Sequence, residues 1–264
     1  RGRFLSTDRN QGDKRHGRII DNTATLAVRT LASGMMAGVT SPARAWFRLS
    51  VPDADLMEFA PVRVWLHEVE GRMRDVFARS NLYNVLPTLY EELGVFGTAA
   101  MVVLEDHADV IRCYPMTAGE YTIANGPRLD VDTLYREVSM TASQAVAWFG
   151  REHVSRQVLD LCERGATETW IEFVNAIEPA GMNAGAIRPA GMNAGAIEPN
   201  DERQDLSGTA GKRWRSVWFE KTAGCEGLCR VSGFDEFPAM APRWHLRGGD
   251  VYGTSPGMEA LGDV

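Results

Sequence analysis

The sequence contains little cysteine and no long hydrophobic run. Its 264 residues include four scattered cysteines, Cys113, Cys162, Cys225 and Cys229, so they indicate no disulfide framework and a reducing compartment is expected. No apolar run reaches the roughly 18 residues that a membrane-spanning helix needs. The first residues also contain no apolar signal-peptide segment. We therefore expect no membrane partner.

The chain also lacks an excess of basic residues. Its formal net charge is −7, with 28 Lys and Arg against 35 Asp and Glu, which argues against a general nucleic-acid-binding surface. Residues 1–18 run the other way, because basic side chains outnumber acidic ones there. This stretch predicts a mobile basic arm.

Hydrophobic spacing predicts three helices near the N-terminus. Apolar residues recur at helical spacing over residues 20–37 and again over residues 55–79, and a third helix is expected from Asn81 to Gly94. Pro87 is tolerable early in that third helix. Between the first two helices, the apolar and aromatic run at 46–49 favours a short strand.

The middle of the chain predicts a largely antiparallel sheet. Alternating or continuous apolar runs predict strands, with Asn125-Gly126 forming a hairpin turn, at residues 98–104, 110–114, 121–124, 129–140, 169–177, 214–221 and 228–232. Thr141 and Gln144 have the spacing of a capping box, which predicts a helix that ends near Gly150. A second short helix is expected at 155–164.

A ten-residue repeat interrupts this pattern. Residues 176–185 recur at 186–195, with Arg188 in place of Glu178, and a partial third copy ends at residue 199. A Pro-, Gly- and Ala-rich period cannot bury a core and falls short of the three full repeats of a solenoid. We therefore expect a flexible, disordered insertion. Its length costs little stability, because loop-closure entropy grows only logarithmically.

Together these patterns predict an α+β fold in which N-terminal helices pack on a largely antiparallel sheet. The expected divisions are a mobile basic arm at 1–18, an α+β region at 19–175, a repeat-containing flexible loop at 176–211 and a continuation of the α+β region at 212–264.

One motif has the spacing of a catalytic signature. Gly253-Thr-Ser-Pro-Gly257 fits the G-x-S-x-G motif of a serine hydrolase, with Ser255 as nucleophile. The oxyanion hole of that fold needs the backbone N–H of the next residue, and Pro256 has none. The motif therefore favours a helix start, with Ser255 as the N-cap and Pro256 at the first position. A serine hydrolase is the third alternative for function, behind two structural ones.

Two metal-like patterns are incomplete. Cys225 and Cys229 have no second cysteine pair, and His245 stands alone nearby, so four zinc ligands are hard to assemble. His67-Glu68 begins like H-E-x-x-H, but position 71 is glycine. We expect no metal site and no cofactor.

Clusters of acidic residues give no stronger signal. Residues 105–109 include Glu105, Asp106, His107 and Asp109 between two strands, which favours a solvated turn. Asp130 and Asp132 alternate on a strand, which is weak support for acid–base chemistry. No Walker A loop is present, so the chain is not an ATP-hydrolysing motor. The sequence predicts no catalytic residue and no enzyme.

Four segments of the sequence have a specific wording, namely residues 29–49 (RTLASGMMAGVTSPARAWFRL), 77–97 (FARSNLYNVLPTLYEELGVFG), 233–244 (GFDEFPAMAPRW) and 250–263 (DVYGTSPGMEALGD). They resemble a known family, the portal or head-to-tail connecting proteins of short-tailed, podovirus-type bacteriophages. Their order and spacing resemble the family along nearly the whole chain. The duplicated repeat at about 176–199 is the departure from it.

The resemblance implies a subunit of a homo-oligomeric ring, typically a dodecamer, at the portal vertex of the capsid in the virion. Double-stranded DNA passes non-specifically through its channel during packaging and ejection. Terminase, capsid or scaffolding proteins and tail adaptor proteins are the implied partners, with assembly in the bacterial host cytoplasm. The chain resembles the N-terminal, wing-like part of such a protein. The alternative is another head-completion or adaptor structural protein.

The resemblance assigns no DNA-channel residues, because the family gives no short motif for them. A closed ring does require two different faces on each subunit. Large aromatic side chains are expected to act as core or subunit-interface anchors, namely Trp46, Trp65, Tyr83, Tyr90 and Phe96.

Overall fold

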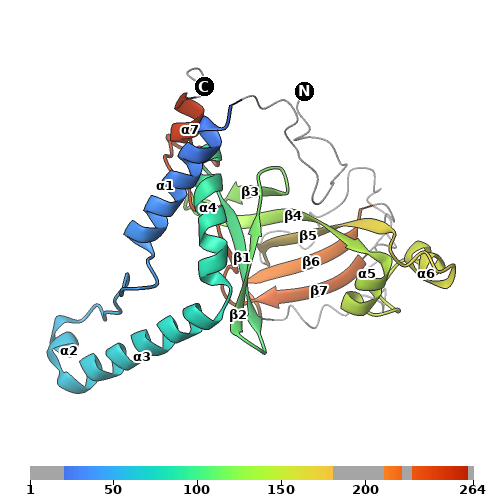
Figure 1. Ribbon diagram of the computed structural model, residues 1–264. Coiled ribbons are helices and arrows are strands. Elements are labelled where there is room, and N and C mark those ends of the chain that lie inside the picture. Colours follow the sequence, from blue (N-terminus) through green and yellow to red (C-terminus); the bar gives the residue numbers. More distant parts are fainter. Residues whose placement is uncertain (1–20, 181–210, 222–227, 261–264) are drawn as a thin grey trace. The chain divides into compact units, whose positions relative to one another are not determined.

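The computed structural model describes residues 21–180, 211–221 and 228–260, which fall into two compact units (Figure 1). Unit 1 comprises Arg1–Gly119 together with Ala239–Val264, and unit 2 comprises Glu120–Pro238. The predicted basic arm at 1–18 lies outside the described residues. So does the predicted repeat loop from residue 181 to residue 210.

Unit 1 begins with α1 (Thr23–Val39), close to the predicted helix over 20–37. The expected strand at 46–49 was wrong, because these residues form no strand. The ring of Trp46 instead stacks on that of Phe77 with centroids 6.0 Å apart, and Phe47 packs on the same ring at 5.8 Å. The aromatic run therefore gains its burial from a helix rather than from a sheet.

The single helix predicted over 55–79 was also wrong, because two helices occupy this stretch. Phe59, with extended backbone (φ −71°, ψ 116°), separates α2 (Ala54–Glu58) from α3 (Ala60–Arg79). Pro61 lies in the first turn of α3. Inside a continuous helix this proline would lose a hydrogen bond and clash with the preceding turn, so the helix restarts just before it.

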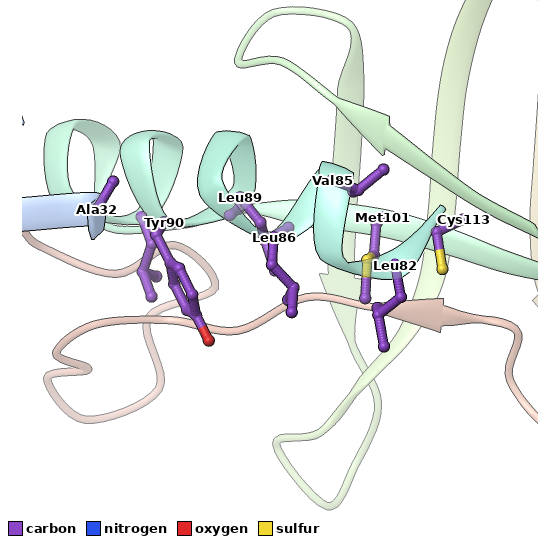
Figure 2. Packing of buried hydrophobic residues seen from close by; sticks show 10 residues of the cluster. Ala32, Leu82, Val85, Leu86, Leu89, Tyr90, Met101 and Cys113 are labelled. Carbon is purple, nitrogen blue, oxygen red and sulfur yellow. The ribbon is translucent and has the colours of Figure 1, made fainter. Parts of the chain in front are cut away.

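The core of unit 1 surrounds α4 (Leu82–Phe96). Figure 2 shows how its apolar side chains lie with Ala32 of α1 and with Met101 and Cys113 of the neighbouring strands. Seven residues of α4 are buried in this way, at positions 82, 85, 86, 89, 90, 93 and 94. Pro87 stands inside the helix, near its start.

Both ends of α4 depart from the predicted helix in an informative way. Asn81 precedes the helix but makes no side-chain cap; its amide group instead bonds the backbone N–H and C=O of Cys113, at 2.8 Å each. The predicted stop at Gly94 was wrong, because the helix continues to Phe96 and is capped by Gly97, which adopts a left-handed conformation (φ 70°). At Gly94 an added Cβ would lie 2.7 Å from Leu31 of α1, so this glycine permits close helix packing.

A three-stranded antiparallel sheet completes unit 1. It contains β1 (Ala100–Asp106), β2 (Val110–Met116) and the short β8 (Ala239–Met240), in the order β2-β1-β8. The central strand, β1, begins and ends two residues later than the strand predicted at 98–104. Its first three residues are almost fully buried. The partner β8 comes from a part of the chain more than a hundred residues later.

Unit 2 is a five-stranded antiparallel sheet whose strand order follows the sequence. The strands, in the order β3-β4-β5-β6-β7, are β3 (Tyr121–Asn125), β4 (Val131–Thr141), β5 (Trp170–Pro179), β6 (Trp214–Glu220) and β7 (Leu228–Phe234). The predicted hairpin is confirmed, although its loop is longer than two residues: the N–H of Gly126 donates to the C=O of Asp130. The fifth strand of the chain continues to Pro179, two residues beyond its predicted end.

Two short helices cover part of one face of this sheet. The capping box at Thr141 and Gln144 is confirmed and begins α5 (Ala142–Phe149), while Ser155 caps α6 (Arg156–Glu163). The ring of Phe149 packs 5.3 Å from Phe173 and 5.7 Å from Trp218, measured between centroids. With helices packed on antiparallel sheets in both units, the predicted α+β class is confirmed.

Candidate interaction surfaces

The hydrolase-like motif is a structural junction. Ser255 is 2% exposed; its Oγ donates to the C=O of Val95 at 2.6 Å and accepts from the N–H of Met258 at 3.1 Å. The second bond caps the short helix α7 (Pro256–Glu259), with Pro256 in its first turn. A nucleophile needs an exposed hydroxyl beside a base, whereas this hydroxyl is buried between two backbone groups. The interpretation as a helix cap is confirmed.

Gly253 of the same motif packs with its backbone directly against the backbone of Gly97, just after α4. A Cβ on Gly253 would lie 2.3 Å from the C=O oxygen of Gly97, and one on Gly97 would lie 2.5 Å from that of Gly253. The N–H of Trp244 donates to Gly97, and the N–H of Gly253 donates to the hydroxyl of Thr98 at 2.8 Å. We call residues 94–99 and 242–257, which these contacts join, the clasp.

The remaining cysteine candidates are described only in part. Cys225 lies outside the described residues, while Cys229 is buried in β7 and burial raises its pKa to about 12. The backbone of His245 pairs with that of Thr254 in an isolated bridge. In the described part of the chain, no group of three or more His, Cys, Asp or Glu side chains could hold a metal ion.

The acidic cluster between β1 and β2 is a turn, as predicted. Asp106 accepts hydrogen bonds from the N–H groups of Asp109 and Ala108, at 2.8 Å each, and these bonds lower the pKa of its carboxyl group. A carboxylate occupied by its own turn is a local cap rather than a catalytic base.

The remaining candidates are His67 and the pair Asp130 and Asp132, and their contacts are local or at exposed sites. His67 is exposed on α3. Asp132 accepts from the hydroxyl of its neighbour Thr133 at 2.9 Å, and Asp130 lies 3.8 Å from the guanidinium of Arg128 at an exposed site. Nothing in these contacts supports acid–base chemistry.

A polar network inside unit 2 gave no signal in the sequence. Arg136 donates to Asn175 at 3.1 Å and lies 5.1 Å from the ring centre of Trp218, while Asn175 donates to Ser216 at 2.9 Å. These residues come from three strands, and only their pairing brings them together. The network satisfies polar groups buried in the middle of the sheet, which is a structural role.

The predicted aromatic anchors divide into buried and exposed residues. Tyr90 is buried and its hydroxyl pairs with that of Thr40 at 2.8 Å. Trp46 donates to the hydroxyl of Tyr83 at 3.1 Å. Phe96 ends α4 as a partly buried side chain. Trp65, by contrast, is 59% exposed. Of the five predicted anchors, it is therefore the one whose side chain is accessible to a binding partner.

Exposed apolar side chains gather at one end of α3. Leu56 of α2 is 47% exposed, Phe59 58% and Trp65 59%. The carboxylates of Asp55 and Glu58 are exposed between and beside them. We call residues 53–65 the acidic tip.

A second exposed set lies in the clasp region, between β8 and α7. Trp244, Leu246 and Tyr252 are exposed by 38–45%. Arg247 lies among them with its side chain exposed. We call residues 243–252 the basic loop, since Arg243 and Arg247 outnumber Asp250.

None of the helices within residues 21–180, 211–221 and 228–260 has both the length and the apolar character needed to cross a membrane.

The chain is similar to known phage proteins over its whole length. The family model described as "Bacteriophage head to tail connecting protein" matches residues 1–264. The "Portal protein" of Salmonella phage epsilon15 is 46% identical over 263 residues, or 99% of this chain, and the "Probable portal protein" of Bordetella phage BPP-1 is 46% identical over 263 residues. The chain spans 44% of the length of each of these relatives.

Proposed function

The chain belongs to the family of bacteriophage head to tail connecting proteins, and we propose that it is part of a portal subunit that assembles into a closed ring at one vertex of the capsid. The observation that carries this proposal is 46% identity along nearly the whole chain to a portal protein of one phage and a probable portal protein of another. Phage portals are structural proteins rather than enzymes, in keeping with the buried, doubly bonded Ser255.

Within that proposal, the ring is the channel through which double-stranded DNA is packaged and ejected. Each phosphate that a protein neutralises adds salt-dependent affinity, so a channel should carry DNA without a strongly basic surface. The net charge of −7 supports passage of this kind. Terminase and tail adaptor proteins would dock on the outer ends of the ring, and the assembled ring would be a component of the virion.

The decisive experiment is the mass of the full chain in solution, measured by light scattering and followed by negative-stain imaging. Closed rings with a central opening, with a mass that is an integral multiple of the subunit, are expected. A stable monomer at high concentration, without rings at any salt concentration, would contradict self-assembly. That outcome would instead favour a head-completion or adaptor protein that waits for its partner.

A further inference from the structure

We infer that neighbouring copies of this chain join by inserting the acidic tip (residues 53–65) of one copy against the basic loop (residues 243–252) of the next. This inference rests on the proposed function, since it assumes that copies assemble, and it names the two surfaces that meet. The occupant of each surface is thus a second copy of this chain.

The acidic tip has the composition of an interface anchor. Phe59 and Trp65 are more than half exposed, although side chains of this size are the ones that dominate interface energetics when buried. The carboxylate residues Asp55 and Glu58 are exposed as well, and with Asp53 they outnumber the exposed cation Arg63. The surface is therefore an apolar centre with negative charge at its edge, which matches the apolar core and polar rim of protein interfaces.

The basic loop offers exposed apolar groups and a cation to such a surface. It presents Trp244, Leu246 and Tyr252 as exposed apolar groups and Arg247 as an exposed cation, with Asp250 also exposed in the loop. The clasp fixes this loop firmly, because the hydrogen bonds of Trp244 and Gly253 to residues 97 and 98 hold both of its ends. A surface held in place before binding loses little conformational freedom when a partner docks.

One copy cannot bring its own two surfaces together. The clasp contacts the C-terminal end of α4, at Val95 and Gly97, whereas α3 joins the opposite end (Figure 1). The 15 residues of α4 span about 22 Å and the 20 residues of α3 about 30 Å. The aromatic packing of Phe77 holds the late part of α3 near α4, so the tip lies at the far end.

Two different surfaces on one unit are what a ring requires. A head-to-tail contact uses one patch from each subunit, and it closes into a ring when the rotation between neighbours allows it. Both surfaces belong to unit 1, so the contact depends only on the internal structure of that unit.

Charge reversal at one residue of each surface tests the contact in the full chain. Glu58→Lys places an exposed cation between the C-terminal end of α2, which favours it, and the N-terminal end of α3, which disfavours it, so the two dipole effects oppose each other. Arg247→Glu reverses the charge of the loop. Each variant alone should raise the concentration needed for half-assembly on the order of tenfold. The double variant should return that concentration to near the wild-type value. Native mass spectrometry over a dilution series provides the readout.

Mixing the two single variants gives a sharper test. In an even-numbered ring in which Glu58→Lys and Arg247→Glu subunits alternate, every contact joins opposite charges. The equimolar mixture should therefore form rings at concentrations where neither variant does alone. Glu105→Lys, which reverses an exposed charge of β1 away from both surfaces, serves as the matched control and should assemble like the wild type.

The outcomes separate this inference from the proposed function. Wild-type rings that tolerate both single reversals, or a mixture that fails where the double variant succeeds, overturn the tip-to-loop contact and leave the portal proposal intact. Absence of rings from the wild-type protein overturns both. A tip that binds another phage protein, while its reversal leaves the rings unchanged, would assign that surface to a different partner.

Discussion

Unit 2 is built from one continuous stretch of chain, whereas unit 1 is closed by residues from both sides of that stretch. In unit 2 each strand pairs with the next one in the sequence. In unit 1 the hydrogen bond from Gly253 to Thr98 joins residues 155 positions apart. The folds of the two units therefore depend on different parts of the sequence. The fold of unit 2 depends on local alternation and capping, whereas the fold of unit 1 depends on two distant backbone segments that fit only when both are present.

The largest expected effect tests whether the two units are energetically separate. Phe173 is fully buried between α5 and the sheet of unit 2, so Phe173→Ala should lower the free energy of unfolding by about 4 kcal/mol, from lost burial and the cavity left behind. Hydrogen exchange should show lost amide protection in β3–β7 while α4 and β1 stay protected. Loss in both units together would contradict the separation. Trp170→Ala, at an exposed position of the same strand, is the control.

The next effect concerns the clasp. Gly253→Ala places a Cβ 2.3 Å from the C=O oxygen of Gly97, and neither backbone segment can move without breaking its hydrogen bonds to the other. We expect a loss of about 3 kcal/mol, measured by chemical denaturation, with protection lost in unit 1 first. Gly34→Ala is the matched control, because a Cβ there meets nothing within 4 Å in the middle of α1. That variant should be neutral or slightly stabilising.

A smaller pair of effects compares a distant cap with a local one. Ser255→Ala removes a cap and also leaves the C=O of Val95 without its hydroxyl donor, so it should cost about 2 kcal/mol. Thr141→Ala removes the cap of α5 and the contact of its hydroxyl with that of Ser143, both of them local, and should cost about 1 kcal/mol. Equal losses in thermal or chemical unfolding would show that the bond to Val95 adds nothing.

The last prediction involves no substitution: labelling of buried cysteines reports which of the two units unfolds first. Burial raises the pKa of Cys229 to about 12 and also raises that of Cys113. At pH 8 the thiolate fraction of Cys229 is therefore on the order of one in ten thousand. Neither thiol should react with a thiol reagent in the native protein, and both should react in guanidinium. At intermediate denaturant, mass mapping shows which of these two buried cysteines is labelled first, Cys113 of unit 1 or Cys229 of unit 2, and this identifies the less stable unit. Rapid native labelling would contradict the described burial.

The sequence was most informative where structure is set by near neighbours. The capping box at Thr141 and the hairpin after Asn125 need only residues within a few positions, and both are confirmed. The break at Phe59 was missed because the apolar stripe runs on past it, although Pro61 was a signal for the restart. The chosen helix stop at Gly94 failed because that glycine serves packing against Leu31 instead.

The candidate surfaces show the same limit. Mechanism alone correctly rejected Ser255 as a nucleophile, since Pro256 offers no N–H. No sequence pattern, however, could show that Gly97 and Gly253 cross, because nothing local marks two glycines so far apart as neighbours. Nor could periodicity show that Trp65 is exposed, since it belongs to an apolar helical stripe of which only part is covered.

The discontinuity of unit 1 sets an order of events during synthesis on the ribosome. After residue 119 has been made, about 120 further residues must follow before β8 and then the clasp exist, which takes roughly ten seconds at ordinary translation rates. Throughout that interval the apolar face of α4 and the edge of β1 lack their C-terminal partners, because the ribosome is making unit 2, whose last strand β7 ends only shortly before β8. The N-terminal part of unit 1 thus stays incomplete while the whole of unit 2 is made, and this half-built part is where a chaperone would bind.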